Sequence, residues 1–392
     1  MTPLGHVWRS PLRSTWLTTL LGAALLPGVL LVAVTGLLSH AAYQPDLGAN
    51  ALVPRGSDVQ PFVVGWPTSP AWLYAATQGL HVTVGIVMVP VLLAKLWSVI
   101  PRLFAWPPVT GPAHGLERLG IALLVGSAVF QFATGIANAQ LYYPWHFDFL
   151  GAHYYGGLVF IGALALHVAL KAPAMRRAMA TRRAVLADGL RAPEPAAPTL
   201  SRRGLFALVG AGAGALAVTT AGQSIGGPLR ELALFAPRGT SLSFPVNKTA
   251  RVAAVTPAMV GPGWTLALRG ERDMQLSLAD LHAMAQHSYA LPIACVEGWS
   301  TTQRWTGVRL ADLARLAGAP DARELRVRSL QPRGRFRRAT LGEAQIHDAR
   351  SLLALEVNGA KLPLDHGFPA RIIVPALPGV HCTKWIAELR FT

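Results

Sequence analysis

The sequence predicts a two-part membrane protein: an α-helical bundle of four helices plus one anchor helix, followed by a mixed α+β domain. Hydrophobic residues make up 52% of the 392 residues and charged residues only 14%, which is too apolar for an ordinary soluble chain. Five uncharged runs reach the roughly 20 residues that a helix needs to cross a bilayer. After residue 230, charges are frequent, apolar runs are short and turn signals recur, as in a folded domain outside the membrane.

The apolar runs divide the chain into four parts. The first four runs are rich in Leu, Val and Ala and form the predicted bundle. The fifth is separated from them by a linker that is first basic and then rich in Pro and Ala. The runs are 16–38, 72–94, 119–138, 149–170 and 204–222, and the predicted parts are 1–175 (bundle), 176–203 (linker), 204–222 (anchor) and 230–392 (α+β domain).

Positive charges predict the orientation. The net charge is +16, and the stretch 171–203 alone holds eight Lys and Arg residues. By contrast, 39–71 has only Arg55 and 139–148 has none. Because cytoplasmic loops carry the excess of Lys and Arg, we expect a bacterial inner-membrane protein with a cytoplasmic N-terminus and a periplasmic C-terminal domain. Arginines placed beside apolar runs favour a lipid bilayer as partner and exclude a nucleic acid.

The fifth run begins with a pair of arginines. Arg202 and Arg203 precede a modest Gly/Ala-rich segment, and this pattern resembles a twin-arginine export signal. Such signals carry proteins that fold before they cross the membrane. A plain basic flank before a span is the alternative. The segment shows no clear cleavage site, so we expect it to remain as an anchor.

The C-terminal part predicts both strands and helices. Alternating or continuous apolar runs indicate strands at 324–330, 352–359 and 370–377. The patterns at 277–287 and 309–318 indicate short helices, the second of which ends at Gly318. About 160 residues are enough for one such domain.

Cys295 is the most informative residue. It is one of two cysteines and lies in the run LPIACVEGWSTTQRWTGVRLADL at 291–313, which matches no disulfide or zinc spacing. The run resembles the active-site segment of the sulfite-oxidase superfamily of molybdopterin oxidoreductases. Its Cys-Val-Glu start is closer to the bacterial methionine sulfoxide reductase catalytic subunit type. The resemblance implies that Cys295 ligates molybdenum, and pairing with Cys382 would remove that thiolate. A buried small hydrophobe is the alternative.

A second segment carries the same resemblance. Residues 358–391 contain HGFPARIIVP followed by a basic residue beside a tryptophan, which is similar to the end of the family's molybdenum domain. The resemblance implies that His366 and Arg371 lie near the pterin and Lys384 near its phosphate. Surface charge is the alternative for the two basic residues.

Three weaker candidates complete the predicted site. FPVNKTA at 244–250 looks like the family's early pterin-contacting segment, so Asn247 is a candidate contact. Arg304 in QRWTGVRL is a candidate anion contact for substrate or pterin, with a plain salt bridge as the alternative. The arginines between 333 and 338 could steer an anionic substrate or form a solvated face.

Histidines inside the apolar runs indicate a second redox centre, because ionisable residues in membrane spans are expensive and usually functional. His81 lies in the second run, and His153 and His167 lie in the fourth. Fourteen residues of helix rise about 21 Å and return to nearly the same face. The pattern resembles the membrane cytochrome b subunits of formate dehydrogenases and hydrogenases. It implies that His81 and His153 are axial ligands of one outer haem b; a polar pair bonded between helices is the alternative.

An inner haem on His167 lacks its expected second ligand. In the family this ligand often precedes a tryptophan at the start of the first span, where this chain has Thr15. His6 and His114 are possible substitutes from the cytoplasmic side. One haem is therefore expected, and a second remains open.

Together with the apolar runs, these resemblances imply a membrane-bound molybdopterin-dependent oxidoreductase. Electrons pass between a periplasmic molybdenum centre and haem b, with quinone as the expected membrane partner. The expected substrate is a small oxo compound such as an S-oxide. A sulfite-type dehydrogenase running in the oxidative direction and a non-catalytic electron-transfer or ligand-binding protein remain as alternatives. A transporter is disfavoured because no repeat relates the spans.

Overall fold

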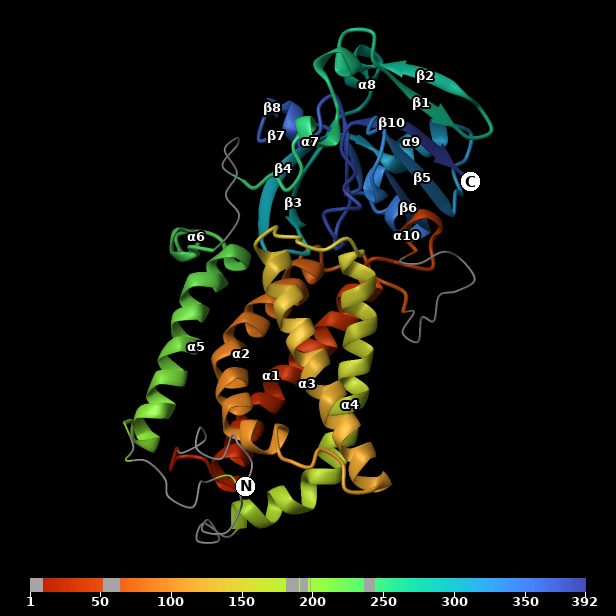
Figure 1. The fold of residues 1–392 in the computed structure, drawn as a ribbon. Helices are drawn as coiled ribbons and strands as arrows, with labels where there is room; N and C mark the ends of the chain where they lie inside the picture. The colour runs from red at the N-terminus through yellow and green to blue at the C-terminus, as the bar shows by residue number, and fades with distance from the viewer. Residues whose placement is uncertain (1–9, 52–63, 181–189, 191–196, 198, 236–243) are drawn as a thin grey trace. The chain divides into compact units, whose positions relative to one another are not determined.

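A computed structural model describes residues 10–51, 64–180, 190, 197, 199–235 and 244–392 (Figure 1). Most of the predicted linker, His6 and Arg55 lie outside the described residues. The chain forms two compact units. The helical unit comprises Met1–Val34, His81–Asn138 and Tyr142–Thr220, and the C-terminal unit comprises Thr35–Leu80, Ala139–Leu141 and Ala221–Thr392.

Five helices in the described part of the chain are long and apolar enough to cross a membrane. This confirms the five predicted helices, and each helix extends beyond its apolar run into flanking residues. The end of the second helix is tied down by Arg118, which donates to the carbonyls of Arg102 and Leu103 at 2.6 Å each, as basic residues often do at helix C-termini. The helices are α1 (Thr15–Ala42), α2 (Leu73–Leu103), α3 (Pro112–Ala139), α4 (Phe149–Ala180) and α5 (Arg202–Ile225).

In the helical unit, α5 packs against α1 and α2. Leu17, Leu21 and Ala94 form a buried cluster to which α5 adds three apolar side chains, at residues 205, 206 and 209. Large apolar side chains elsewhere on the helices, such as Leu93 and Leu208, are exposed. Apolar outer faces of this kind suit a lipid environment.

The C-terminal unit contains two five-stranded sheets (Figure 1). The first has the order β2-β1-β10-β5-β6, with β1 and β10 parallel and its other pairs antiparallel. The second has the order β3-β4-β7-β8, and β9 also pairs with β7. The strands are β1 (Thr265–Arg269), β2 (Met274–Ser277), β3 (His287–Ala294), β4 (Ser300–Arg309), β5 (Glu324–Ser329), β6 (Arg338–Gly342), β7 (Leu352–Val357), β8 (Ala360–Lys361), β9 (Arg371–Ile373) and β10 (Ile386–Phe391).

Short helices complete this unit, and the three predicted strands and two predicted helices are confirmed. The side chains of Ser277 and Asp280 form a capping box at the start of α8. Gly318 follows α9 with φ +76°, a conformation that favours glycine. The short helices are α6 (Leu229–Leu232), α7 (Ala250–Ala253), α8 (Leu278–Ala283), α9 (Leu310–Leu316) and α10 (Glu343–His347), with 3₁₀ turns η1 (Gly48–Asn50), η2 (Pro257–Val260), η3 (Arg335–Arg337) and η4 (Leu364–His366).

The described parts of the connection between α1 and α2 (residues 43–51 and 64–72) contact the sheet-containing part of the C-terminal unit. Asn50 pairs with the edge strand β6: its Nδ2 donates to the carbonyl of Thr340 at 2.8 Å, and its Oδ1 accepts from the N–H of Thr340 at 2.9 Å. The indole of Trp66 donates to the carbonyl of Ala376 at 2.7 Å. The prediction placed this stretch in the 1–175 bundle, whereas its contacts join it to the sheets.

Candidate functional site

Cys295 lies at the tight turn between β3 and β4. The two strands pair up to Ala294 and Ser300, so residues 295–299 form the connection. The N–H of Cys295 donates to the carbonyl of Trp299 at 2.9 Å, and the N–H of Gly298 donates to the carbonyl of Cys295 at 3.0 Å. Gly298 adopts φ +94°, which a residue with a side chain rarely does. The turn therefore holds the cysteine in a fixed orientation.

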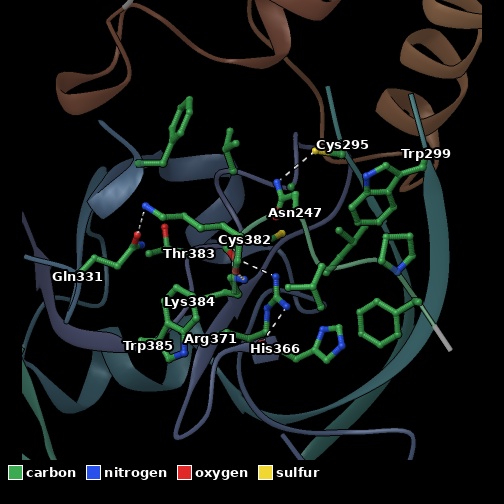
Figure 2. A pocket seen from close by; sticks show the side chains of 18 of the residues that line it. Asn247, Cys295, Trp299, Gln331, His366, Arg371, Cys382, Thr383, Lys384 and Trp385 are labelled. Carbon is green, nitrogen blue, oxygen red and sulfur yellow. Dashed lines mark hydrogen bonds between the residues drawn. The ribbon is translucent and has the colours of Figure 1, made fainter. Parts of the chain in front are cut away.

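Five of the predicted residues meet in one pocket. The pocket has about 800 Å³ of empty volume, part of it open to solvent. Its walls come from four stretches that are far apart in the sequence, at 244–248, 293–299, 331–336 and 366–385. Asn247, Cys295, His366, Arg371 and Lys384 all line it (Figure 2).

Asn247 contacts the sulfur directly. Its Nδ2 donates to the Sγ of Cys295 at 3.4 Å (Figure 2). Cys295 itself is only 2% exposed. Hydrogen bonds to a ligating sulfur orient it and tune the metal that it holds. Asn247 is thus placed to stabilise a thiolate.

Arg371 forms the buried floor of the pocket. Its Nη1 donates to the carbonyl of His366 at 2.9 Å and its Nη2 to the carbonyl of Cys382 at 3.1 Å. Its guanidinium carbon lies 5.1 Å from the ring centre of Trp305. The ring of His366 packs on Phe244 at 3.9 Å between centroids. Two carbonyls and one aromatic face therefore fix the guanidinium.

Lys384 and Lys248 add positive charge. The Nζ of Lys384 donates to the carbonyls of Lys248 at 2.5 Å and Asp365 at 2.9 Å. The Nζ of Lys248 donates to Oε1 of Gln331 at 2.8 Å. The residues that line this pocket include no carboxylate. Burial, and to a smaller extent Arg371, lowers the pKa of Lys384 to about 7, and burial lowers that of Arg371 to about 10. An anion in the pocket would stabilise both cations.

The surroundings of Cys295 disfavour its thiolate in the absence of a bound cation. Burial raises the pKa of Cys295 well above its ordinary value, and the nearby Glu297 raises it further. Burial also raises the pKa of Glu297, which accepts a hydrogen bond from the indole of Trp299 at 2.7 Å. A bound metal would oppose this effect, because metals ligate the thiolate and not the thiol.

The pocket fits a molybdopterin. Nε of Arg371 and Oγ1 of Thr383 are buried and have no hydrogen-bond partner among the described residues, so they can serve a bound polar group. The cationic wall suits a phosphate. The described residues contain no cluster of three or more His, Cys, Asp or Glu able to hold a metal alone. One thiolate suits a metal whose other ligands come from an organic cofactor.

Arg304 does not join this group, contrary to its predicted role as an anion contact. It lies on β4, where successive side chains alternate between the two faces of the sheet. Its neighbour Trp305 is completely buried, and Arg304 is exposed and absent from the pocket wall. Its backbone pairs with Asn358 instead.

Several lining residues were missed in the sequence. Lys248 directly follows the candidate Asn247 and could have been found there. Arg335 belongs to the noted arginine run and lines the pocket. Gln331 and Thr383 carry no local signal, because only the folded chain brings them to this wall.

The three histidines predicted as haem ligands fall into two sets. The rings of His81 and His153 lie 6.3 Å apart between centroids, nearly perpendicular at 80°. Nδ1 of His81 lies 2.9 Å from the carbonyl of Val32, so it must donate its proton there. His167 lies fourteen residues beyond His153 on α4 and is half-buried. The structure brings the first two together and leaves the third apart.

The second ring is also engaged at Nδ1. The hydroxyl of Thr134 lies 2.6 Å from the carbonyl of Phe130 and 3.0 Å from Nδ1 of His153. Both rings thus use Nδ1 for a hydrogen bond within the helical unit, an arrangement typical of imidazoles that ligate a metal through Nε2.

Comparison with known proteins defines the class of the C-terminal unit. The family model of the oxidoreductase molybdopterin binding domain matches residues 253–392. The description of this family and the names of the relatives given below are those of oxidoreductases. The match begins beyond the five apolar helices, so it makes no statement about them.

Individual relatives agree with the family. The mitochondrial sulfite oxidase of Rattus norvegicus is 33% identical over 147 residues, covering 31% of this chain and 27% of that protein. The chain thus spans about a quarter of the sulfite oxidases it matches. The protein-methionine-sulfoxide reductase catalytic subunit MsrP of Xanthomonas axonopodis pv. citri is 32% identical over 163 residues, covering 38% of this chain and 50% of that protein. Among solved structures, the sulfane dehydrogenase SoxCD of Paracoccus pantotrophus covers 33% of this chain and 38% of its own, with 21% identity and a TM-score of 0.31.

Proposed function

We propose that the protein is a membrane-bound, molybdopterin-dependent oxidoreductase that reduces an S-oxide. The observation that carries this proposal is the meeting of Cys295, Asn247, Arg371 and Lys384 in one cationic pocket. Cys295 supplies the protein thiolate to molybdenum, and Asn247 donates to that sulfur. Arg371 and His366 hold the pterin, and Lys384 binds its phosphate.

The cofactor supplies two-electron oxygen-atom transfer, while the protein binds and orients it. Reduction of an S-oxide consumes two electrons and two protons and releases a thioether and water. Ile293, Trp299 and Val380 give the pocket an apolar wall near the cysteine. Such a wall suits the thioether side of the substrate and excludes water. The similarity to MsrP, whose name states that it acts on methionine sulfoxide in proteins, favours this substrate class.

Sulfite oxidation is the second candidate. The cationic lining by Lys248 and Arg335 favours a small oxyanion, and sulfite oxidases match the same domain. In that direction electrons leave the pocket for the membrane. Both candidates use the same residues and differ in the direction of electron flow.

Haem b in the helical unit is the proposed electron carrier. His81 and His153 would ligate the iron through Nε2, since the Nδ1 of each is engaged elsewhere. Two imidazole–metal bonds of about 2 Å each fit between rings whose centres are 6.3 Å apart. Quinone is the proposed partner in the membrane. The five apolar helices would cross the inner membrane with the N-terminus in the cytoplasm and the C-terminal unit in the periplasm.

Metal analysis with an optical spectrum of the purified full-length protein tests this proposal. We expect molybdenum near one per chain and a b-type haem band. Cys295→Ser should keep the haem and abolish reduction of methionine sulfoxide. Cys382→Ser, the matched control at the other buried cysteine, should keep molybdenum.

Stoichiometric zinc, or no metal, would defeat the assignment, as would normal turnover by Cys295→Ser. A protein with haem but without molybdenum would be the non-catalytic electron-transfer protein. Reduction of the haem by sulfite in place of its oxidation by methionine sulfoxide would select the second candidate.

A further inference from the structure

The turn that carries Cys295 is held from outside the sheets by the ends of two long helices. Nε2 of Gln78, near the start of α2, donates to the carbonyl of Val296 at 2.8 Å. Oγ of Ser224, near the end of α5, donates to the carbonyl of Gly298 at 2.5 Å. Oγ of Ser300 donates back to the carbonyl of Ser224 at 2.9 Å. These contacts all lie within the C-terminal unit.

Gln78 is an unusual residue for this position. Its side chain is only 3% exposed on a helix whose composition is otherwise strongly apolar. A buried amide is costly unless it forms hydrogen bonds, and Oε1 of Gln78 has no partner among the described residues. The bond to Val296 is therefore the one side-chain hydrogen bond that Gln78 forms among the described residues. An apolar residue of similar size would pack without that cost.

The position of Gln78 links two candidate redox residues. On one side it binds the residue directly after Cys295. On the other side, His81 follows it by three residues on the same helix, which is close to one helical turn. One bonded route between Cys295 and His81 thus runs through one peptide unit, one hydrogen bond and less than one turn of α2.

We propose that Gln78 is a positioning residue that couples the Cys295 turn to helix α2 for electron transfer. This inference rests on the proposed function. Each reduction of an S-oxide needs two electrons, which a haem b held by His81 and His153 would supply one at a time. The hydrogen bond holds the Cys295 turn against the start of α2 during both one-electron transfers. The chemistry in the pocket itself does not use Gln78.

The test separates electron delivery from chemistry. Full-length protein with its haem reduced by dithionite is mixed with methionine sulfoxide, and haem oxidation is followed by stopped-flow absorbance. Turnover is measured separately with reduced benzyl viologen, a soluble donor. Gln78→Met keeps the shape and removes the donor, and Gln78→Asn keeps the amide but shortens its reach. Both should slow haem oxidation at least about fivefold, which corresponds to about 1 kcal/mol in a barrier, with viologen turnover unchanged.

Thr77→Val is the matched control. Thr77 is the adjacent buried residue, and within the described part of the chain its hydroxyl bonds only to carbonyls of its own helix. The haem of the Thr77→Val variant should be oxidised at the wild-type rate. Molybdenum and haem contents are measured for every variant, so that only intact proteins are compared.

Two results would overturn the inference. Haem oxidation at the wild-type rate in both Gln78 variants would show that the bond is irrelevant to transfer. Equal losses in haem oxidation and viologen turnover would show that Gln78 serves the pocket and not the link. If wild-type haem responds neither to methionine sulfoxide nor to sulfite, the proposed function itself fails, and this outcome is distinct from the other two.

Discussion

Replacement of Arg371 by methionine should remove the cofactor while leaving the fold nearly as stable as before. The side chain is 5% exposed and donates two hydrogen bonds, to His366 and Cys382. Hydrogen bonds from a charged group contribute about 1.5–3 kcal/mol each, so their loss alone would cost about 3–6 kcal/mol. That figure is an upper bound, because it ignores the cost of burying the charge.

The cost of burying the positive charge of Arg371 is of similar size. Burial lowers the pKa of Arg371 from its ordinary value to about 10, and a shift of this extent corresponds to about 3 kcal/mol against the charged form. The net change in the free energy of unfolding should therefore be about 0–3 kcal/mol. Arg371 would thus add little to the stability of the cofactor-free fold. An anionic ligand that offsets the cost of burying its charge explains why an arginine stands here.

The assay uses full-length protein in detergent. The thermal midpoint of the cofactor-free form, followed by tryptophan fluorescence, should fall by only a few degrees in Arg371→Met. Molybdenum content after purification should fall below one tenth of wild type, and Arg371→Lys should recover part of it. Wild-type molybdenum content in Arg371→Met would refute the reasoning. So would a loss of stability well beyond 6 kcal/mol, because Arg371 would then be chiefly structural.

Three further outcomes follow from the same structure. Asn50→Ala removes both hydrogen bonds to Thr340 and should cost about 2 kcal/mol, seen as faster amide exchange along β6; unchanged exchange would contradict the pairing. In cofactor-free protein the pKa of Lys384 is lowered to about 7, so between about pH 7 and 10 Lys384 is protonated in the unfolded state but not in the folded state, and the free energy of unfolding should rise with pH. Lys384→Met should flatten this rise when melting is measured as a function of pH. A rise of the same size in the variant would exclude Lys384 as its source. The b-type band should vanish in His81→Ala and persist in His167→Ala, and equal loss in both would indicate a second haem.

The helices were predictable because their signal is local. A run of about 20 uncharged residues has few alternatives to a membrane helix, and all five runs became helices. Strands such as β5 were equally accessible, since its residues alternate between buried and exposed. The site residues in 358–391 were found through resemblance, and their spacing alone would not have shown that His366 and Arg371 touch.

Contacts between distant segments could not be predicted. Asn50 and Thr340 lie 290 residues apart, and Gln78 and Val296 lie 218 apart, so no local pattern relates them. The position of Arg304 could not be predicted for a different reason. Its motif placed it near the cysteine in sequence, but the period of two along β4 turned it to solvent while Trp305 entered the core.

The pairing of Asn50 with β6 bears on how this domain can be produced and studied. Strand β6 closes one edge of its sheet, and an uncovered edge is a template for joining another copy. A shortened version beginning near residue 230 would lack the covering segment and expose that edge. Crystallographers seeking a soluble catalytic fragment would do better to graft residues 43–51 back onto it, or to block β6 with a lysine, than to trim the chain at the last membrane helix.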